Sequence, residues 1–136
     1  MRVSLIMLST SLLSVGAYAH HSQSPFFDQS KDIEIEGVVQ RWDFRNPHAV
    51  LYIEVANNTG SDDLWAVQFS SLAVLIRSGI DADAFLSGEK VSVVGHPAWN
   101  ENAHGIGSPA VTKQGGRQYV DPLRSGNFTP GSATSR

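Results

Sequence analysis

The chain has 136 residues, of which 41% are hydrophobic, and this is enough for one domain with its own core. With 10 basic and 13 acidic residues its formal net charge is −3, which argues against a surface that follows nucleic-acid phosphates. Cysteine is absent, which excludes both a disulfide framework and thiolate metal sites.

The first 19 residues have the pattern of a secretory signal peptide. Arg2 supplies the positive start, an apolar stretch runs over residues 5–15, and Ala17-Tyr18-Ala19 matches the small-x-small cleavage pattern. The apolar stretch is shorter than the roughly 20 residues of a transmembrane helix. We therefore expect an exported, periplasmic protein, cleaved after Ala19, with no stable membrane insertion after cleavage. Because the leader holds Arg2 and no acid, the mature net charge is −4.

An extended arm and a first strand are expected next. In the arm, residues 20–31, Pro25, Phe26 and Phe27 are the candidate anchors. Residues 32–42 alternate between apolar and polar side chains, which predicts a strand. Gly37 lies inside this strand and indicates a bulge or a sharp bend.

The middle of the chain predicts a hairpin and then a helix. Asn46-Pro47 breaks the first strand, residues 49–56 and 64–69 predict two more strands, and residues 57–60 have turn composition. Apolar residues then recur at helical spacing at Leu72, Leu75, Ile76 and Ile80, with Ser70 or Ser71 as N-cap and Gly79 at the C-terminal end. One further helical turn is expected after Asp81, with Ala82, Phe85 and Leu86 on it and Gly88 at its end.

Residues 90–96 predict a fourth strand and residues 106–113 a fifth, which is expected to pair with residues 117–120. Three strands, a short helix and two strands form the order of a five-stranded OB-like Greek-key barrel, and a small open β-sandwich is the alternative. The expected organisation is a signal peptide (1–19), an arm (20–31), a mainly β barrel domain (32–120) and a disordered tail (121–136).

Histidines are the candidate metal ligands of this cysteine-free chain. If cleavage follows Ala19, His20 carries both an α-amino group and an imidazole, which can chelate one metal ion. A second imidazole completes a three-nitrogen histidine brace, a planar arrangement that favours Cu(II). His21 offers an alternative site formed by the terminal amine, the intervening amide and its own imidazole.

His48 is the predicted partner of His20, because Pro47 presents it from a rigid turn at the entrance of the second strand. His96, at the end of the fourth strand, is a weaker candidate that a barrel could bring towards His48. His104 lies in a Gly-rich loop and ranks last. Trp42 and Phe44, which precede His48, are expected to close the barrel end rather than to stack on a ligand.

A set of short motifs over residues 20–120 resembles a family of small exported bacterial proteins known as domain of unknown function 6152. The motifs are His20-His21-Ser22, Phe27-Asp28, Ile35-Glu36-Gly37-Val38-Val39, Asn46-Pro47-His48, Trp65, Gly88-Glu89-Lys90-Val91 and Gly95-His96-Pro97. The resemblance implies export and an OB-like barrel, but no established activity. Ser24-Pro25-Phe26 replaces the plainer apolar stretch expected in the arm.

The leading hypothesis is a periplasmic protein that carries or sequesters copper. The alternative is an OB-like module that binds a small molecule, a saccharide or a periplasmic protein through its aromatics Trp42, Phe44, Tyr52, Trp65 and Trp99. A copper enzyme that activates oxygen is least favoured, because no substrate surface is evident. No catalytic residue is assigned, and no nucleic-acid partner is expected.

Overall fold

A computed structural model describes residues 25–124 and 134–135 of the chain; residues 1–24, 125–133 and 136 lie outside the described part. Its elements in chain order are β1 (Ile33–Asp43), β2 (Val50–Ala56), β3 (Asp62–Gln68), α1 (Leu72–Arg77), β4 (Lys90–Pro97), β5 (Gly105–Lys113), β6 (Gln118–Val120) and β7 (Thr134–Ser135).

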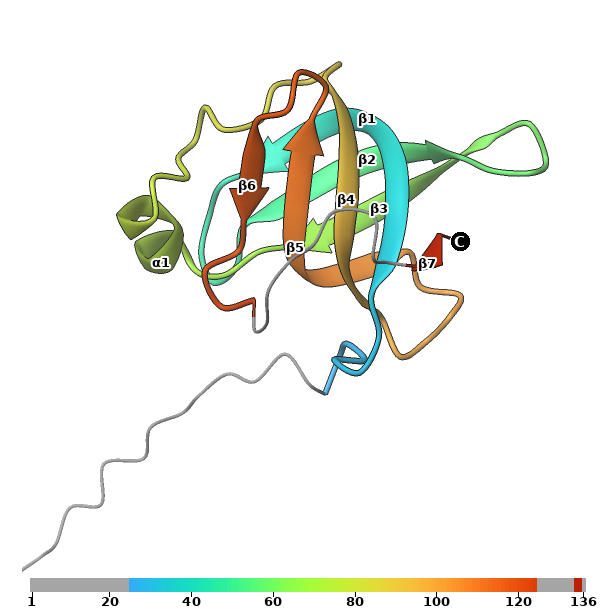
Figure 1. The fold of residues 1–136 in the computed structure, drawn as a ribbon, viewed down its shortest axis with the longest axis horizontal. Coiled ribbons are helices and arrows are strands. Elements are labelled where there is room, and N and C mark those ends of the chain that lie inside the picture. Colours follow the sequence, from blue (N-terminus) through green and yellow to red (C-terminus); the bar gives the residue numbers. More distant parts are fainter. Residues whose placement is uncertain (1–24, 125–133, 136) are drawn as a thin grey trace, which may run out of the picture.

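Five of these strands form a closed barrel (Figure 1). β1 pairs antiparallel with both β2 and β4, β2 pairs with β3, and β4 pairs with β5. A parallel pairing of β3 with β5 closes the ring. This confirms the mainly β, OB-like barrel with one short helix between the third and fourth strands. The closed ring of pairings excludes the open sandwich.

Gly37 marks the place where β1 changes partners. The first half of β1 pairs with β4 and the second half with β2, and Val38 is paired with Lys90 on one side and Glu54 on the other. A Cβ atom at Gly37 would lie 2.3 Å from the backbone oxygen of Glu54. The predicted bend is therefore a close backbone approach, and the irregular register itself comes just after, between Val39 and Arg41.

Alternate residues of the strands fill the barrel with aliphatic side chains. Fully buried members include Val39, Leu51, Ile53, Val67, Val93, Ile106 and Val111. Aromatic rings close one end, where Trp42 lies edge-on to Phe69 and Phe85, with ring centroids 5.2 and 5.1 Å away. The Trp42 indole N–H also donates to the backbone oxygen of Asp81 at 3.0 Å. This confirms that Trp42 closes the barrel end.

The helical region differs from the sequence prediction in two places. α1 ends at Arg77, its Ile76 side chain is 58% exposed, and the buried Ile80 follows the helix. The expected second helical turn is wrong: Asp81 Oδ1 instead accepts the backbone N–H of Asp83 at 3.0 Å. This bond has the spacing of a helix N-cap, but the chain makes only a turn over residues 82–83, and Phe85 is buried outside any helix.

The folded domain continues past Val120, where the tail was expected to begin. β6 pairs with β5 as predicted. The buried Asp121 then accepts the backbone N–H and the hydroxyl of Ser70 at 2.5 and 2.6 Å. Residues 121–124 are thus packed on the barrel, β7 pairs parallel with the start of β1, and the rest of the tail lies outside the described residues.

We predict that Gly37→Ala lowers the free energy of unfolding by about 1–3 kcal/mol, because the new methyl group overlaps the backbone of Glu54. Gly105→Ala is the matched control, since its Cβ would meet ordinary contacts at 3.5 and 3.7 Å. Urea denaturation of both variants checks the prediction. Equal stability of the two variants would show that β1 does not depend on this close approach.

Candidate functional site

The arm is held against the end of β4 by backbone hydrogen bonds. The N–H of Asp28 donates to the oxygen of Pro97 at 2.8 Å, and the N–H of Trp99 donates to the oxygen of Phe26 at 3.1 Å. Phe27, between them, is buried against the barrel, whereas Phe26 is 68% exposed. Of the predicted anchors, Phe27 performs that role and Phe26 does not.

A compact turn fixes the arm to the start of β1. The buried Asp28 carboxylate accepts the hydroxyl of Ser30 at 2.6 Å and its backbone N–H at 3.0 Å, and it lies 3.3 Å from the ammonium of Lys31. The hydrogen bond from the Ser30 hydroxyl lowers the pKa of Asp28 below its usual 3.8. Burial raises this pKa, whereas the backbone N–H of Ser30 and the ammonium of Lys31 lower it further. The ionised form of Asp28 thus stabilises the arm.

A groove of about 590 Å³ lies between the arm, the outer face of β2 and β3, and the loop that joins β4 to β5. We call it the aromatic groove. Its lining residues are Pro25, Phe26, Phe27, Val50, Tyr52, Ala66, Gln68, Ala98, Trp99, Asn100, Ala103, His104 and Gly105. Its volume is in the range of small-molecule sites. Trp99 is 58% exposed at this groove, a degree of exposure unusual for so large a side chain.

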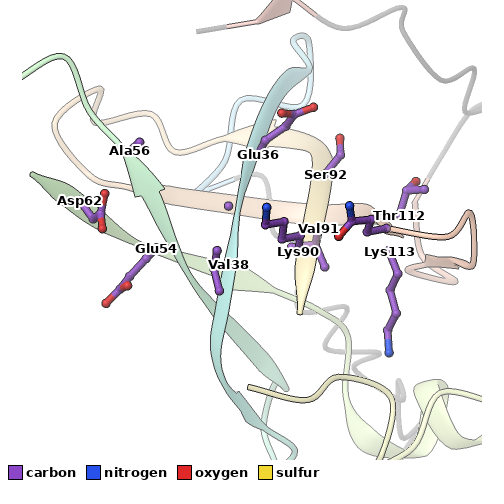
Figure 2. A pocket seen from close by; sticks show the side chains of 12 residues that line it. Glu36, Val38, Glu54, Ala56, Asp62, Lys90, Val91, Ser92, Thr112 and Lys113 are labelled. Carbon is purple, nitrogen blue, oxygen red and sulfur yellow. The ribbon is translucent and has the colours of Figure 1, made fainter. Parts of the chain in front are cut away.

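A second groove, of about 530 Å³, lies where β1, β4 and β5 meet the β2–β3 hairpin (Figure 2). We call it the charged groove, after Glu36, Glu54, Asp62, Lys90 and Lys113. Figure 2 shows the Lys113 side chain directed away from Glu54 and Asp62. Its ammonium is 2.9 Å from Glu89. The charged groove therefore carries both negative carboxylates and positive ammonium groups, rather than charges of a single sign.

His48 lies at the entrance of β2, after a cis peptide bond between Asn46 and Pro47. Its neighbour Ala49 is fully buried and continues the ladder through hydrogen bonds with Phe69 and Ser70. Strand alternation therefore puts His48 on the outer face, the same side as Val50 in the aromatic groove. The His48 Nδ1 atom is buried and has no hydrogen-bond partner within residues 25–124 and 134–135.

His96 lies at the opposite end of β1. Its Nδ1 atom is 2.8 Å from the backbone oxygen of Lys31 and 3.2 Å from the carboxylate of Asp32. The buried Arg124 guanidinium pairs with the same carboxylate and donates to the oxygen of Ser108 at 2.7 Å. One ring nitrogen of His96 is thus engaged, and a fixed positive charge lies close by.

His104 packs on an aromatic ring. Its ring is stacked on Trp65 with centroids 4.9 Å apart, and its Nε2 atom is 3.8 Å from the carboxylate of Asp63. From the sequence, His104 is the last of the candidate metal ligands, because its loop is rich in glycine. Contact with Trp65 could not be foreseen, because it depends on the parallel pairing of β3 with β5.

The described residues do not bring His48 and His96 together. Along β1, Ile33 is paired with Gly95 and Asp43 with Val50, so the two histidines flank opposite ends of an 11-residue strand. Within residues 25–124 and 134–135, no three His, Asp or Glu side chains form a group that could hold a metal ion. His20 and His21, the first and third candidates, lie outside the described residues.

Asp28→Asn is predicted to destabilise the protein at neutral pH, because the amide cannot match the ionised acceptor in the arm turn. Since the folded-state pKa of Asp28 is lowered, its stabilising effect is complete well above pH 3.8 and is lost as the pH falls further. The stability gap between wild type and Asp28→Asn should therefore narrow on acidification.

Unfolding measurements from neutral to strongly acidic pH test this dependence, with the exposed Asp83→Asn as the matched control. A gap for Asp28→Asn that stays constant across the acid range would contradict the role of the charge.

The comparisons with known proteins identify a family and nothing more. No helix in the described part of the chain is both long and apolar enough to cross a bilayer. No curated protein and no solved structure shows significant similarity to this chain. Residues 8–108 match the family of unknown function DUF6152, and this match covers most of the chain. The protein therefore belongs to the DUF6152 family.

Proposed function

We propose that the protein is exported to the periplasm and binds Cu(II), which it carries or sequesters. The leader pattern of residues 1–19 supports export, and cleavage after Ala19 gives His20 a free α-amino group. The His20 amine and imidazole would supply two nitrogen ligands, and His48 a third. Three nitrogen donors in a planar arrangement favour Cu(II) over other divalent first-row metals.

The observation that carries this proposal is the unpartnered Nδ1 atom of His48. A buried polar atom without a hydrogen bond costs about 1–3 kcal/mol, so such atoms call for an explanation. His96 differs, since its Nδ1 atom has the backbone oxygen of Lys31 at 2.8 Å. The His48 Nδ1 atom, by contrast, has no partner among the described residues, and a bound metal ion would give it one.

The length of the arm is compatible with a shared site. Pro25 and Val50 both line the aromatic groove, and His48 lies two residues before Val50. Two residues of extended chain span about 7 Å. His20 lies five residues before Pro25, and five residues can span up to about 17 Å. These chain lengths are compatible with an approach of the new N-terminus to the side of the barrel on which His48 lies.

Two variants of this function differ in their ligands. The His20 brace uses His48, whereas a site formed by the terminal amine, the amide of residue 21 and the His21 imidazole uses no residue of the barrel. The unpartnered His48 favours the first variant. His96 belongs to neither, because it is bound into the cluster with Asp32 at the other end of β1.

A binding module that needs no metal is the second candidate function. The aromatic groove favours it, because an exposed tryptophan and an exposed phenylalanine line a cavity of small-molecule size. This function uses the groove itself, and it is compatible with copper bound at its edge.

The test uses the mature protein as it is exported. Intact mass should place its N-terminus at His20, and a Cu(II) titration followed by electron paramagnetic resonance should show submicromolar binding with nitrogen hyperfine structure. We expect His20→Ala and His48→Ala each to weaken binding by at least about tenfold. His104→Ala is the control, because that ring is stacked on Trp65 and is assigned no role in the site.

A mature chain that starts at another residue would contradict the proposal. So would His48→Ala and His20→Ala variants that bind Cu(II) as tightly as wild type. Loss of binding in a His21→Ala variant, with wild-type binding in His20→Ala and His48→Ala, would support the site that uses His21 and would exclude the one that uses His48.

A further inference from the structure

The aromatic groove is uncharged in a chain that carries 10 basic and 13 acidic residues. None of the described residues that line it is Asp, Glu, Lys or Arg. Arg41 lies over the ring of the lining residue Tyr52 at 3.9 Å, and it is itself paired with Asp43 at 3.0 Å. The groove thus matches a neutral ligand and offers no ion pair to an anionic one.

Two aromatic side chains border the groove from neighbouring segments. Phe26 and Trp99 are joined by a backbone hydrogen bond of 3.1 Å, and their side chains are 68% and 58% exposed. Phe27 already anchors the arm, so the exposed Phe26 is not needed for that purpose. Exposed aromatic rings at a cavity are typical of surfaces that stack on a ligand.

Uncharged polar side chains complete the lining. Gln68 on β3 and Asn100 in the β4–β5 loop each carry an amide, and Tyr52 on β2 carries a hydroxyl. The Asn100 Oδ1 atom accepts the N–H of Asn102 at 3.0 Å, which orients the amide and leaves its NH₂ group as a donor. The groove therefore combines apolar ring faces with hydrogen-bonding groups that bear no charge.

We propose that the aromatic groove binds a neutral oligosaccharide. Sugar rings present apolar C–H faces, which stack on aromatic rings, and hydroxyl groups, which pair with amides. Both features are present here without any charged side chain. Binding at the β2–β3 face also agrees with the way that OB-type barrels take oligosaccharides. A nucleic acid is disfavoured, because its phosphates need the Lys and Arg side chains that the lining lacks.

The experiment is calorimetric titration of the metal-free mature protein with cellotriose, maltotriose and triacetylchitotriose. We expect at least one of these neutral trisaccharides to bind saturably at micromolar to millimolar concentration. Trp99→Ala and Phe26→Ala should each raise the dissociation constant at least about fivefold, because each removes a stacking face. Leu86→Ala is the matched control, an apolar truncation at a 59% exposed position outside the groove, and should bind as wild type.

Failure of all three sugars to bind would overturn the proposal, as would unchanged affinity in Trp99→Ala. Sedimentation analysis tests whether a second copy of the chain occupies the groove. A wild-type dimer that becomes a monomer in Trp99→Ala would assign the groove to that second copy and would overturn the proposal. The site is independent of copper, so the Cu(II) titration of Trp99→Ala should match wild type whether or not a sugar binds.

Discussion

The close approach of β1 to the backbone of Glu54 at Gly37 is the constraint on which the rest of the molecule depends. One strand must pair with β4 over its first half and with β2 over its second, and Val38 belongs to both ladders. A Cβ atom at this position would lie only 2.3 Å from the Glu54 oxygen, so only glycine fits without a shift of the backbone. The barrel can close because β1 pairs with both β4 and β2.

This shared strand also decides where the functional groups lie. Its first residues hold the arm and the cluster of Asp32, His96 and Arg124. Its last residues lead to Trp42, which closes the barrel end, and then to the Asn46–Pro47 turn that presents His48. The two ends are chemically different: one engages its histidine in a partly buried charged cluster, and the other leaves a histidine nitrogen without a partner among the described residues.

Local patterns predicted the elements whose causes are local. Period-two alternation located the strands, Asn46-Pro47 the break, and residues 57–60 the hairpin turn. What failed depends on distant contacts. Ile76 fits a helical apolar stripe, yet α1 ends one residue later and leaves this side chain exposed. Asp121 begins a segment whose composition predicts a disordered tail, but its carboxylate accepts hydrogen bonds from Ser70, which lies 51 residues earlier in the chain. The two grooves likewise arise from segments far apart in sequence.

The proposed copper site is tested most directly by nuclear magnetic resonance of the mature protein with substoichiometric Cu(II), whose unpaired electron broadens nearby amide signals. A site shared by the N-terminus and His48 predicts that Ala49 and Val50 broaden first, ahead of Ser92 and Thr112 in the charged groove. Broadening centred on the charged groove or on the His96 cluster, or broadening that leaves Ala49 and Val50 unaffected, would contradict that site.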